Sequence, residues 1–437
     1  MGDFNIDTQT DVLLVRRKLD LLLRTGKLLM ESAADTNRIE RNMLRVASFL
    51  EIPEDKLHLD IRWKILIVNV SDDTYSFSKF QKCEHHGINM STLLDISNLS
   101  FRAIKQKYTL DEYERELEII ANKPRNFNNY LVALGAGLAC GGFCKLFGCD
   151  WIAFLFTAIA AFVGFRLRTI LHDKDFNVYM SVTCAAFVAT CLAYLSSFTG
   201  LSLTPYHPLL ACVVFLVPGV PMINAVDDLI DSHLLVGFTR ATNSLMMIGS
   251  MTFGITMALS IFILNDTDIV SKFRSLSIIP QDPYYVYALA AAVAAMGFSM
   301  IFNLKPKLLW LVALGGMTSV CIRNFINFEL GYGPVIGSFF GGFVVSLLAI
   351  IFVRKYNIPN HVVSIPSVIP MVPGVLMYRS LLSFFNMNSG ENEVANAFSN
   401  GVTAALIMLC IAIGVAIPNI FARRFLAGRK LKFVNHK

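Results

Sequence analysis

Four polar side chains near the middle of the chain have the spacing of one helix face. Asn224, Asp227, Asp228 and Asp231 recur every three or four residues at the end of a long apolar stretch, which is the period of a helix. A carboxylate at the edge of a membrane can bind a substrate ammonium group or carry a proton. A helix cap in a solvated loop is the ordinary alternative. We prefer that alternative for Asp231 and leave both interpretations open for Asp227 and Asp228.

Two proline-glycine sequences interrupt apolar stretches and could line a binding site. They are Val217-Pro218-Gly219 and Val372-Pro373-Gly374. Proline removes a backbone donor and glycine adds conformational freedom, so both weaken a helix. Freed backbone groups in lipid need polar partners, and paired breaks in two halves of a chain point to a substrate site. Plain proline kinks, which are frequent in membrane helices, are the alternative.

Arginines near the ends of apolar stretches suit the acidic end of a substrate. Arg379 follows the second break, where its guanidinium could hold a carboxylate in a bidentate fork. Arg323 and Arg168 end two other apolar stretches, and snorkelling to lipid headgroups is the better interpretation for Arg168. The candidate substrate-binding residues are therefore Pro218, Gly219, Asn224, Asp227, Asp228, Arg323, Pro373, Gly374 and Arg379.

Ten apolar stretches are long enough to carry these residues through a membrane, since a spanning helix needs about 20 residues. The expected spans are 129–147, 151–168, 177–198, 206–224, 240–264, 284–302, 307–325, 333–353, 361–379 and 399–421. With both termini inside, Lys and Arg gather in the cytoplasmic loops, as the positive-inside rule requires. We therefore expect an inner-membrane protein with its N- and C-termini in the cytoplasm.

A repeat at a constant offset of 155 residues relates the two halves of the apolar region. It aligns the two proline-glycine breaks, and it aligns Gly142-Phe143 with Gly297-Phe298. Each half holds five spans, and an odd number inverts the second half relative to the first. Inverted repeats are the architecture of many secondary transporters. The expected fold is an α-helical polytopic membrane protein of about ten transmembrane helices in two inverted five-helix repeats.

The first 127 residues have the pattern of a small α+β cytoplasmic domain. Apolar residues recur at helical spacing over 11–30 and 36–50, and they alternate over 59–70 as in a strand, which a turn at Asp72-Asp73 would end. Thr109 and Glu112 predict a capping box for a further helix. The expected domains are this domain at 1–127, a first repeat at 128–264, a linker at 265–282, a second repeat at 283–422 and a basic cytoplasmic tail at 423–437.

Composition excludes several other classes of protein. The chain is 54% apolar and 16% charged, whereas soluble domains usually carry about 25% charge. Its net charge of +6 arises in loops and tail, so we expect no nucleic-acid partner. No phosphate loop, nucleophile elbow or HExxH sequence occurs, so we expect no enzyme, cofactor or metal site. The expected partners are a small amino acid or carboxylic acid, protons and the lipid bilayer, and a homo-oligomer is left open.

Three stretches resemble the threonine/serine exporter family. The first runs from Arg24 to Glu40 and contains Gly26 and Glu31-Ser32-Ala33-Ala34-Asp35-Thr36, with Ala33 where glycine is usual. The second runs from His207-Pro208 through the first break to Asp231, and the third joins Pro366 to the second break. The resemblance implies export of threonine and serine driven by the proton motive force. Split relatives, which divide these halves between two chains, are associated with succinate export.

The leading hypothesis is a secondary exporter of a small amino acid that binds near the two breaks. Asp227 or Asp228 would bind its ammonium group or a proton, and Arg379 or Arg323 its carboxylate. An exporter of a small dicarboxylate such as succinate is the alternative within the same class. A membrane-anchored sensor or scaffold would instead bind its ligand in the N-terminal domain without any flux, and a membrane enzyme would show turnover by residues 1–127.

Overall fold

The structure is a computed structural model that describes residues 9–71, 75–84, 87–264, 267–269, 272–273, 276, 282–356, 358–385 and 391–434. It divides into two compact units, each taken by itself below. The first comprises Met1–Asn126 with Asn224–Ala241, and the second comprises Phe127–Ile223 with Thr242–Lys437. The expected turn at Asp72-Asp73, most of the expected linker and the last three residues of the expected tail lie outside the described residues.

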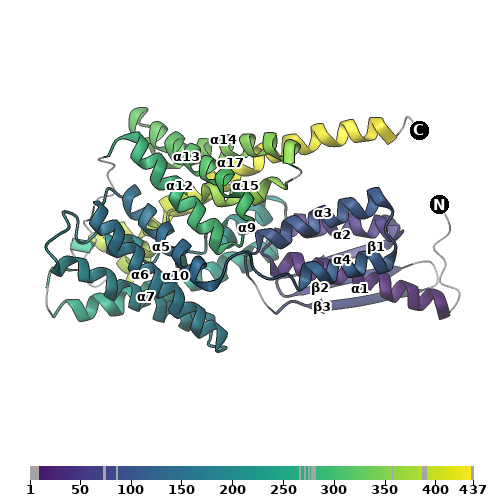
Figure 1. Ribbon diagram of the computed structural model, residues 1–437, viewed down its shortest axis with the longest axis horizontal. Coiled ribbons are helices and arrows are strands. Elements are labelled where there is room, and N and C mark those ends of the chain that lie inside the picture. Colours follow the sequence, from purple (N-terminus) through teal and green to yellow (C-terminus); the bar gives the residue numbers. More distant parts are fainter. Residues whose placement is uncertain are drawn as a thin grey trace. The chain divides into compact units, whose positions relative to one another are not determined.

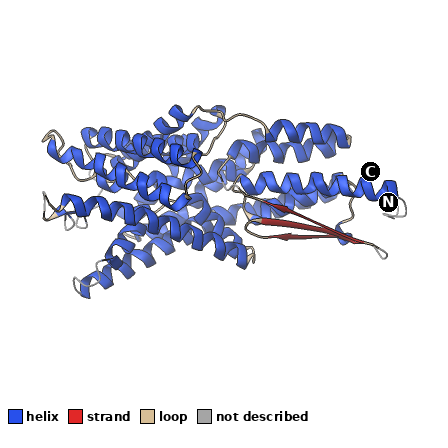
Figure 2. Ribbon diagram, turned by 90° about the horizontal axis from the view of Figure 1, so that it is seen from below, coloured by secondary structure: helices blue, strands red, loops and turns tan. Residues whose placement is uncertain are grey.

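The first unit packs helices against one face of a three-stranded antiparallel sheet (Figures 1 and 2). In this unit Leu66, Val68 and Val70 are fully buried, while Ile65 on the other face is exposed, so one face of the sheet forms the core. The elements are α1 (Gln9–Glu31), α2 (Thr36–Phe49), η1 (Glu54–Lys56), β1 (Leu57–Ile61), β2 (Ile65–Ser71), β3 (Ser76–Lys82), α3 (Met90–Gln106) and α4 (Leu110–Ala121).

The single strand expected over 59–70 is wrong, because the chain reverses within it. Arg62 N–H donates to the Ile65 carbonyl at 2.9 Å and closes a tight turn between β1 and β2. The reversal also changes which residues face the core. Alternation through Ile65 and Ile67 predicted those side chains to be inside, but their neighbours Leu66 and Val68 are buried instead. A hairpin turn changes which residues of the alternating pattern face the core, and composition alone did not reveal this turn.

Local signals explain where the helices of this unit begin. Asp35 caps α2, because its side chain accepts a hydrogen bond from the Arg38 backbone N–H. The capping box of Thr109 and Glu112 is confirmed at the start of α4. Helix α3 was not predicted from the sequence, although Asn89 caps it.

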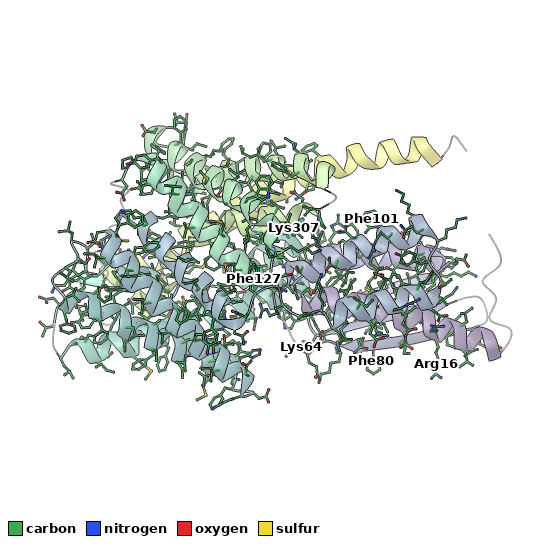
Figure 3. The ribbon with its side chains drawn as sticks, in the orientation of Figure 1. Arg16, Lys64, Phe80, Phe101, Phe127 and Lys307 are labelled. Atoms are coloured by element: carbon green, nitrogen blue, oxygen red, sulfur yellow. The ribbon has the colours of Figure 1, made fainter. Side chains whose placement is uncertain are left out.

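Gly26, in the middle of α1, allows that helix to pack closely. A Cβ there would lie 2.6 Å from the Met43 sulfur of α2 and 2.9 Å from Leu66 of β2. Figure 3 shows two exposed aromatic residues of the same unit, Phe80 beside the sheet and Phe101 on α3. The Arg45 guanidinium covers the Phe101 ring at 3.8 Å from its centroid.

The second unit holds helices long and apolar enough to span a membrane. Among the described residues, eight single helices qualify, and two bent helix pairs raise the number to ten. The chain is therefore a polytopic membrane protein. Its long helices are α5 (Asn129–Leu146), α6 (Trp151–Asp173), α7 (Val178–Tyr194, continued by η2, Leu195–Phe198), α10 (Leu234–Phe262), α12 (Tyr284–Ile301), α13 (Leu309–Asn324, between η4, Pro306–Leu308, and η5, Phe325–Glu329), α14 (Gly333–Tyr356) and α17 (Glu391–Val434).

The two bent pairs occur where the proline-glycine breaks were expected. In the first, α8 (Pro208–Ala211) and η3 (Val214–Leu216) precede α9 (Gly219–Ile230), with a bend of 59°. In the second, α15 (Asn360–Val368) and η6 (Ile369–Met371) precede α16 (Gly374–Phe385), with a bend of 51°. Val217 and Val372 leave the helical region at almost equal angles, φ −62°, ψ 124° and φ −60°, ψ 126°. The same sequence therefore produces the same backbone twice.

Candidate functional site

The polar cluster of Asn224, Asp227, Asp228 and Asp231 belongs to the first unit, on the last part of α9 and the turn that follows it. Asn224 is 1% exposed, Asp227 7% and Asp228 1%. A solvated loop therefore does not describe these three residues. Asp231 is only partly buried, and its carboxylate accepts a hydrogen bond from the Asn37 side chain at 2.6 Å.

Asp228 is held on both of its carboxylate oxygens. Its Oδ1 accepts a hydrogen bond from the Thr36 backbone N–H at 2.8 Å. Its Oδ2 lies 3.1 Å from Nε of Arg240 on α10, and both side chains of this ion pair are at least nine-tenths buried. Arg240 also donates to the Ala34 carbonyl at 2.8 Å. Removing one partner of such a buried pair is strongly destabilising, so Asp228 has a structural role.

The turn between α1 and α2 supplies the backbone groups that hold this cluster. Ala33 has a left-handed backbone, with φ of 61°, and its carbonyl accepts a hydrogen bond from the Asn224 side chain at 2.8 Å. An L-residue with a side chain adopts this conformation at a cost that glycine avoids. The backbone thus explains why glycine suits this position, and Ala33 shows that alanine can occupy it.

Asp227 differs from its neighbour, because neither of its carboxylate oxygens has a hydrogen-bond partner among the described residues. The same is true of Oδ1 of Asn224, which lies one helical turn earlier. A buried carboxylate without a partner is expensive unless a proton or a cation joins it. Two side chains of α2 and its cap, Asp35 and Arg38, lie within electrostatic range of Asp227. Asp227 and Asn224 therefore hold buried acceptor atoms without hydrogen bonds in the described part of the chain.

In the second unit, the two breaks pack against each other reciprocally. A Cβ on Gly374 would lie 2.8 Å from Cγ2 of Val217, and a Cβ on Gly219 would lie 3.3 Å from Cγ2 of Val372. Each valine stands two residues before the glycine of its own break. The contact is therefore the same in both directions, as expected for two segments related by a local twofold axis.

Helices α5 and α12 repeat this reciprocity. Gly142 packs on the Ala290 backbone, and Gly297 packs on the Gly135 backbone. Phe143 meets Phe298, its own counterpart at the offset of 155, with ring centroids 5.8 Å apart and an interplanar angle of 79°. Small residues allow such close backbone approach between membrane helices.

The structure does not bring the two candidate arginines of the second unit to the breaks. Arg379 donates to the carbonyls of Phe273 and Leu276, both at 2.9 Å. Arg323 contacts the Asn324 amide oxygen next to it at 3.3 Å. The four Pro and Gly residues at positions 218, 219, 373 and 374 are buried in this unit, and each glycine packs against the valine of the other break.

Two sets of polar residues were missed by the sequence analysis. In the first unit they are Thr36 and Arg240, whose partners come from distant parts of the chain, and Arg38, which pairs with Asp35 three residues earlier. In the second unit, Asn360 of α15 donates to Ser346 of α14 at 3.1 Å and also contacts Asn419 of α17. Buried polar residues within apolar helices were the available signal for this second set. Within the described ranges, no three His, Cys, Asp or Glu side chains gather as metal ligands.

Comparison with known proteins finds relatives among membrane transporters and exporters. YjjP of Escherichia coli (strain K12), described as a probable succinate transporter subunit, is 26% identical over 55% of this chain and 93% of that protein. The threonine/serine exporter of Corynebacterium glutamicum is 21% identical over 95% of this chain and 84% of that protein. A probable threonine/serine exporter of Mycobacterium tuberculosis is 20% identical over 96% of this chain and 79% of that protein.

None of the solved structures matches the chain significantly. Two protein-family models match the sequence of the chain. The family described as a putative threonine/serine exporter matches residues 20–262, and the family described as the threonine/serine exporter ThrE matches residues 287–421. The first match alone covers more than half of the chain. The protein is a membrane exporter, and the chain belongs to the threonine/serine exporter family.

Proposed function

We propose that this chain exports a small amino acid, threonine or serine, across the inner membrane in exchange for protons. The fused exporters of Corynebacterium glutamicum and Mycobacterium tuberculosis support this substrate class, because their similarity extends over nearly the whole chain. The N-terminal unit and both termini lie in the cytoplasm in this proposal, as the distribution of Lys and Arg favours.

The observation that carries the proposal is the reciprocal packing of the two breaks. Val217 contacts Gly374 and Val372 contacts Gly219, so the two halves meet through the same residues. Two inverted repeats with such a contact can exchange conformations, and each exchange opens the substrate path to the other side of the membrane. The domain limits expected above, with repeats at 128–264 and 283–422, fit this mechanism.

Asp227 is the residue through which proton exchange would be coupled to export. It is buried and has no hydrogen-bond partner in the described parts of the chain, so it needs either a proton or a cation. A proton and the ammonium group of the substrate would then compete for the same oxygens. Because Asp227 would bind either the proton or the substrate ammonium group but not both, the protein would act as an antiporter.

The test is efflux of labelled threonine from proteoliposomes under an imposed pH gradient. Asp227→Asn should reduce efflux about tenfold or more, because charged hydrogen bonds contribute roughly 1.5–3 kcal/mol, and it should leave the melting temperature unchanged or higher. Asp228→Asn should lower the melting temperature, because it leaves Arg240 buried without its partner. Asp231→Asn is the matched control, with efflux close to that of the unaltered protein. Full efflux by Asp227→Asn would remove this residue from the mechanism.

Export of succinate is the second candidate, favoured by the similarity to YjjP over 55% of this chain. The same vesicles loaded with labelled succinate distinguish the two. Succinate efflux that exceeds threonine efflux at equal loading would show that the dicarboxylate, and not the amino acid, is the substrate.

A further inference from the structure

We infer that the N-terminal unit itself binds the zwitterionic backbone of the amino acid, with Arg38 as the carboxylate-binding residue opposite Asn224 and Asp227. This inference rests on the proposed function and deepens it. It assigns part of the substrate site to the turn between α1 and α2, and it selects between the two candidate substrates by their charge.

The first step is a charge count over the buried charged side chains in and around the polar cluster, which leaves out Asp231 because it is only partly buried and bonds to Asn37. Asp228 pairs with Arg240, and Asp35 pairs with Arg38, both at 3.1 Å with side chains at least nine-tenths buried. Asp227 is buried among these pairs without a hydrogen bond or an ion pair of its own within the described residues. One positive charge is therefore missing at this position, which a ligand with one cationic group would supply.

The second step is the number of acceptors around that missing charge. Asp227 offers Oδ1 and Oδ2, and Asn224 offers Oδ1, and none of these buried acceptors has a hydrogen bond in the described structure. Oγ1 of Thr36 and the ion-paired Oδ2 of Asp228 are also without a hydrogen bond there. Residues three apart on a helix are neighbours on its surface. A primary ammonium group has three N–H donors and one positive charge, so the surplus of acceptors and the negative charge point to an ammonium group at this place.

The third step is the unused edge of the Arg38 guanidinium. Its Nε bonds to Oδ2 of Asp35 at 3.1 Å. Its two terminal nitrogens make no hydrogen bond within the described residues, although the side chain is 7% exposed. Asp35 thereby fixes the plane of the guanidinium and leaves its outer edge open. A planar fork of this kind suits a carboxylate.

The groups proposed to hold the ammonium and the carboxylate lie on neighbouring segments of the first unit. Hydrogen bonds from the Asn224 side chain to the Ala33 carbonyl and from the Thr36 N–H to Asp228 place the start of α2, which carries Arg38, beside the part of α9 that carries Asp227. An α-amino acid carries its ammonium and carboxylate groups on the same carbon, so it can satisfy both together. A dicarboxylate would place a negative charge against Asp227 and gain nothing from the acceptors of Asn224 and Asp227. The site therefore favours threonine or serine over succinate.

The experiment measures binding to the purified full chain by calorimetry with four probes: L-threonine, L-threoninol, 3-hydroxybutyrate and succinate. Threoninol keeps the ammonium group and lacks the carboxylate, whereas 3-hydroxybutyrate has the reverse. Arg38→Lys should weaken the binding of threonine about tenfold or more, since a bidentate charged contact is lost, and should leave the affinity for threoninol unchanged. Asp227→Asn should weaken the binding of threonine and of threoninol but not that of 3-hydroxybutyrate. Arg62→Gln, which removes an exposed pairing with Asp60, is the control and should change none of them.

Two variants are chosen so that no unpaired charge is left buried and the protein can still fold. Arg38→Lys keeps a positive charge beside Asp35, and the double variant Asp35→Asn, Arg38→Gln removes both charges of the pair together. An unchanged ratio of threonine to threoninol affinity in either folded variant would overturn the inference, and so would succinate binding as tight as threonine in the unaltered protein. Threonine efflux that persists under those results would leave the exporter proposal standing. Absence of threonine efflux in the unaltered protein would instead overturn the proposed function.

Discussion

Asp227 and Asp228 are adjacent in sequence, yet their surroundings give them opposite roles. Asp228 receives a backbone N–H and an arginine, while Asp227 receives neither. Successive residues of a helix point about 100° apart, so the two carboxylates meet different neighbours. A buried carboxylate with partners stabilises the fold, and one without partners is available for function at some cost in stability.

The left-handed backbone at Ala33 gives a prediction at the same scale. Ala33→Gly should raise the melting temperature of the full chain, because glycine relieves about 1–2 kcal/mol of local strain and loses only part of it to unfolded-state entropy. Ala33→Val should lower the melting temperature, since a branched side chain disfavours a positive φ still more. Thermal unfolding in detergent measures both. Equal melting temperatures for all three proteins would show that the strain is not present.

At the scale of elements, the broken helices are defined by what packs across them. Pro218 and Pro373 interrupt the hydrogen bonding, but the valine of each break fills the space beside the glycine of the other. The α5 and α12 pair repeats this arrangement with glycines and a pair of phenylalanines. The contacts between halves are therefore made by small residues that leave little free space.

A double-mutant cycle tests the contact between the breaks. Gly374→Ala should destabilise the protein by about 1–3 kcal/mol and slow efflux, because the new Cβ overpacks against Val217. Adding Val217→Ala should restore much of the loss, since it removes the opposing methyl groups. Gly219→Ala and Val372→Ala form the equivalent cycle at the other break, where the approach is less tight.

Gly249 of α10 provides the control for these substitutions, since a Cβ there meets nothing within 4 Å. Gly249→Ala should be neutral or slightly stabilising, because alanine is the better helix former. Additive effects of Gly374→Ala and Val217→Ala would contradict the packing described here.

At the scale of the whole molecule, the offset of 155 residues relates the loops as well as the breaks. Lys174, after α6, corresponds to Glu329, before α14, and both are exposed. In an inverted repeat, corresponding loops open to opposite sides of the membrane. Five spans per half place the two corresponding loops on opposite sides of the membrane, whereas an even number of spans would place them on the same side.

Cysteine labelling measures that orientation. In a background without the nine native cysteines, Lys174→Cys should react with a membrane-impermeant maleimide in inside-out vesicles and Glu329→Cys in intact spheroplasts. Efflux by each variant serves as the control for folding. Labelling of both cysteines from one side would contradict the inverted arrangement and, with it, the proposed exchange of conformations.

The sequence alone determined the features that depend on local chemistry. In lipid, the backbone N–H and C=O groups of apolar runs about 20 residues long must be hydrogen-bonded within helices. The spans and the two proline breaks could therefore be located from composition. Capping residues likewise marked the start of α4. The same reasoning failed at Arg62, because a tight turn within an alternating strand changes the buried face without changing composition.

Only the tertiary structure decided which polar residues act together. Thr36 bonds to Asp228, and Arg240 bonds to the Ala34 carbonyl, across about two hundred residues of sequence, and partners at such separations leave no local pattern. The structure also gives the Arg379 guanidinium two backbone partners, the carbonyls of Phe273 and Leu276, which the sequence pattern did not predict. Spacing can place side chains on one face of a helix, but the energy of a buried charge depends on what the rest of the fold brings to it.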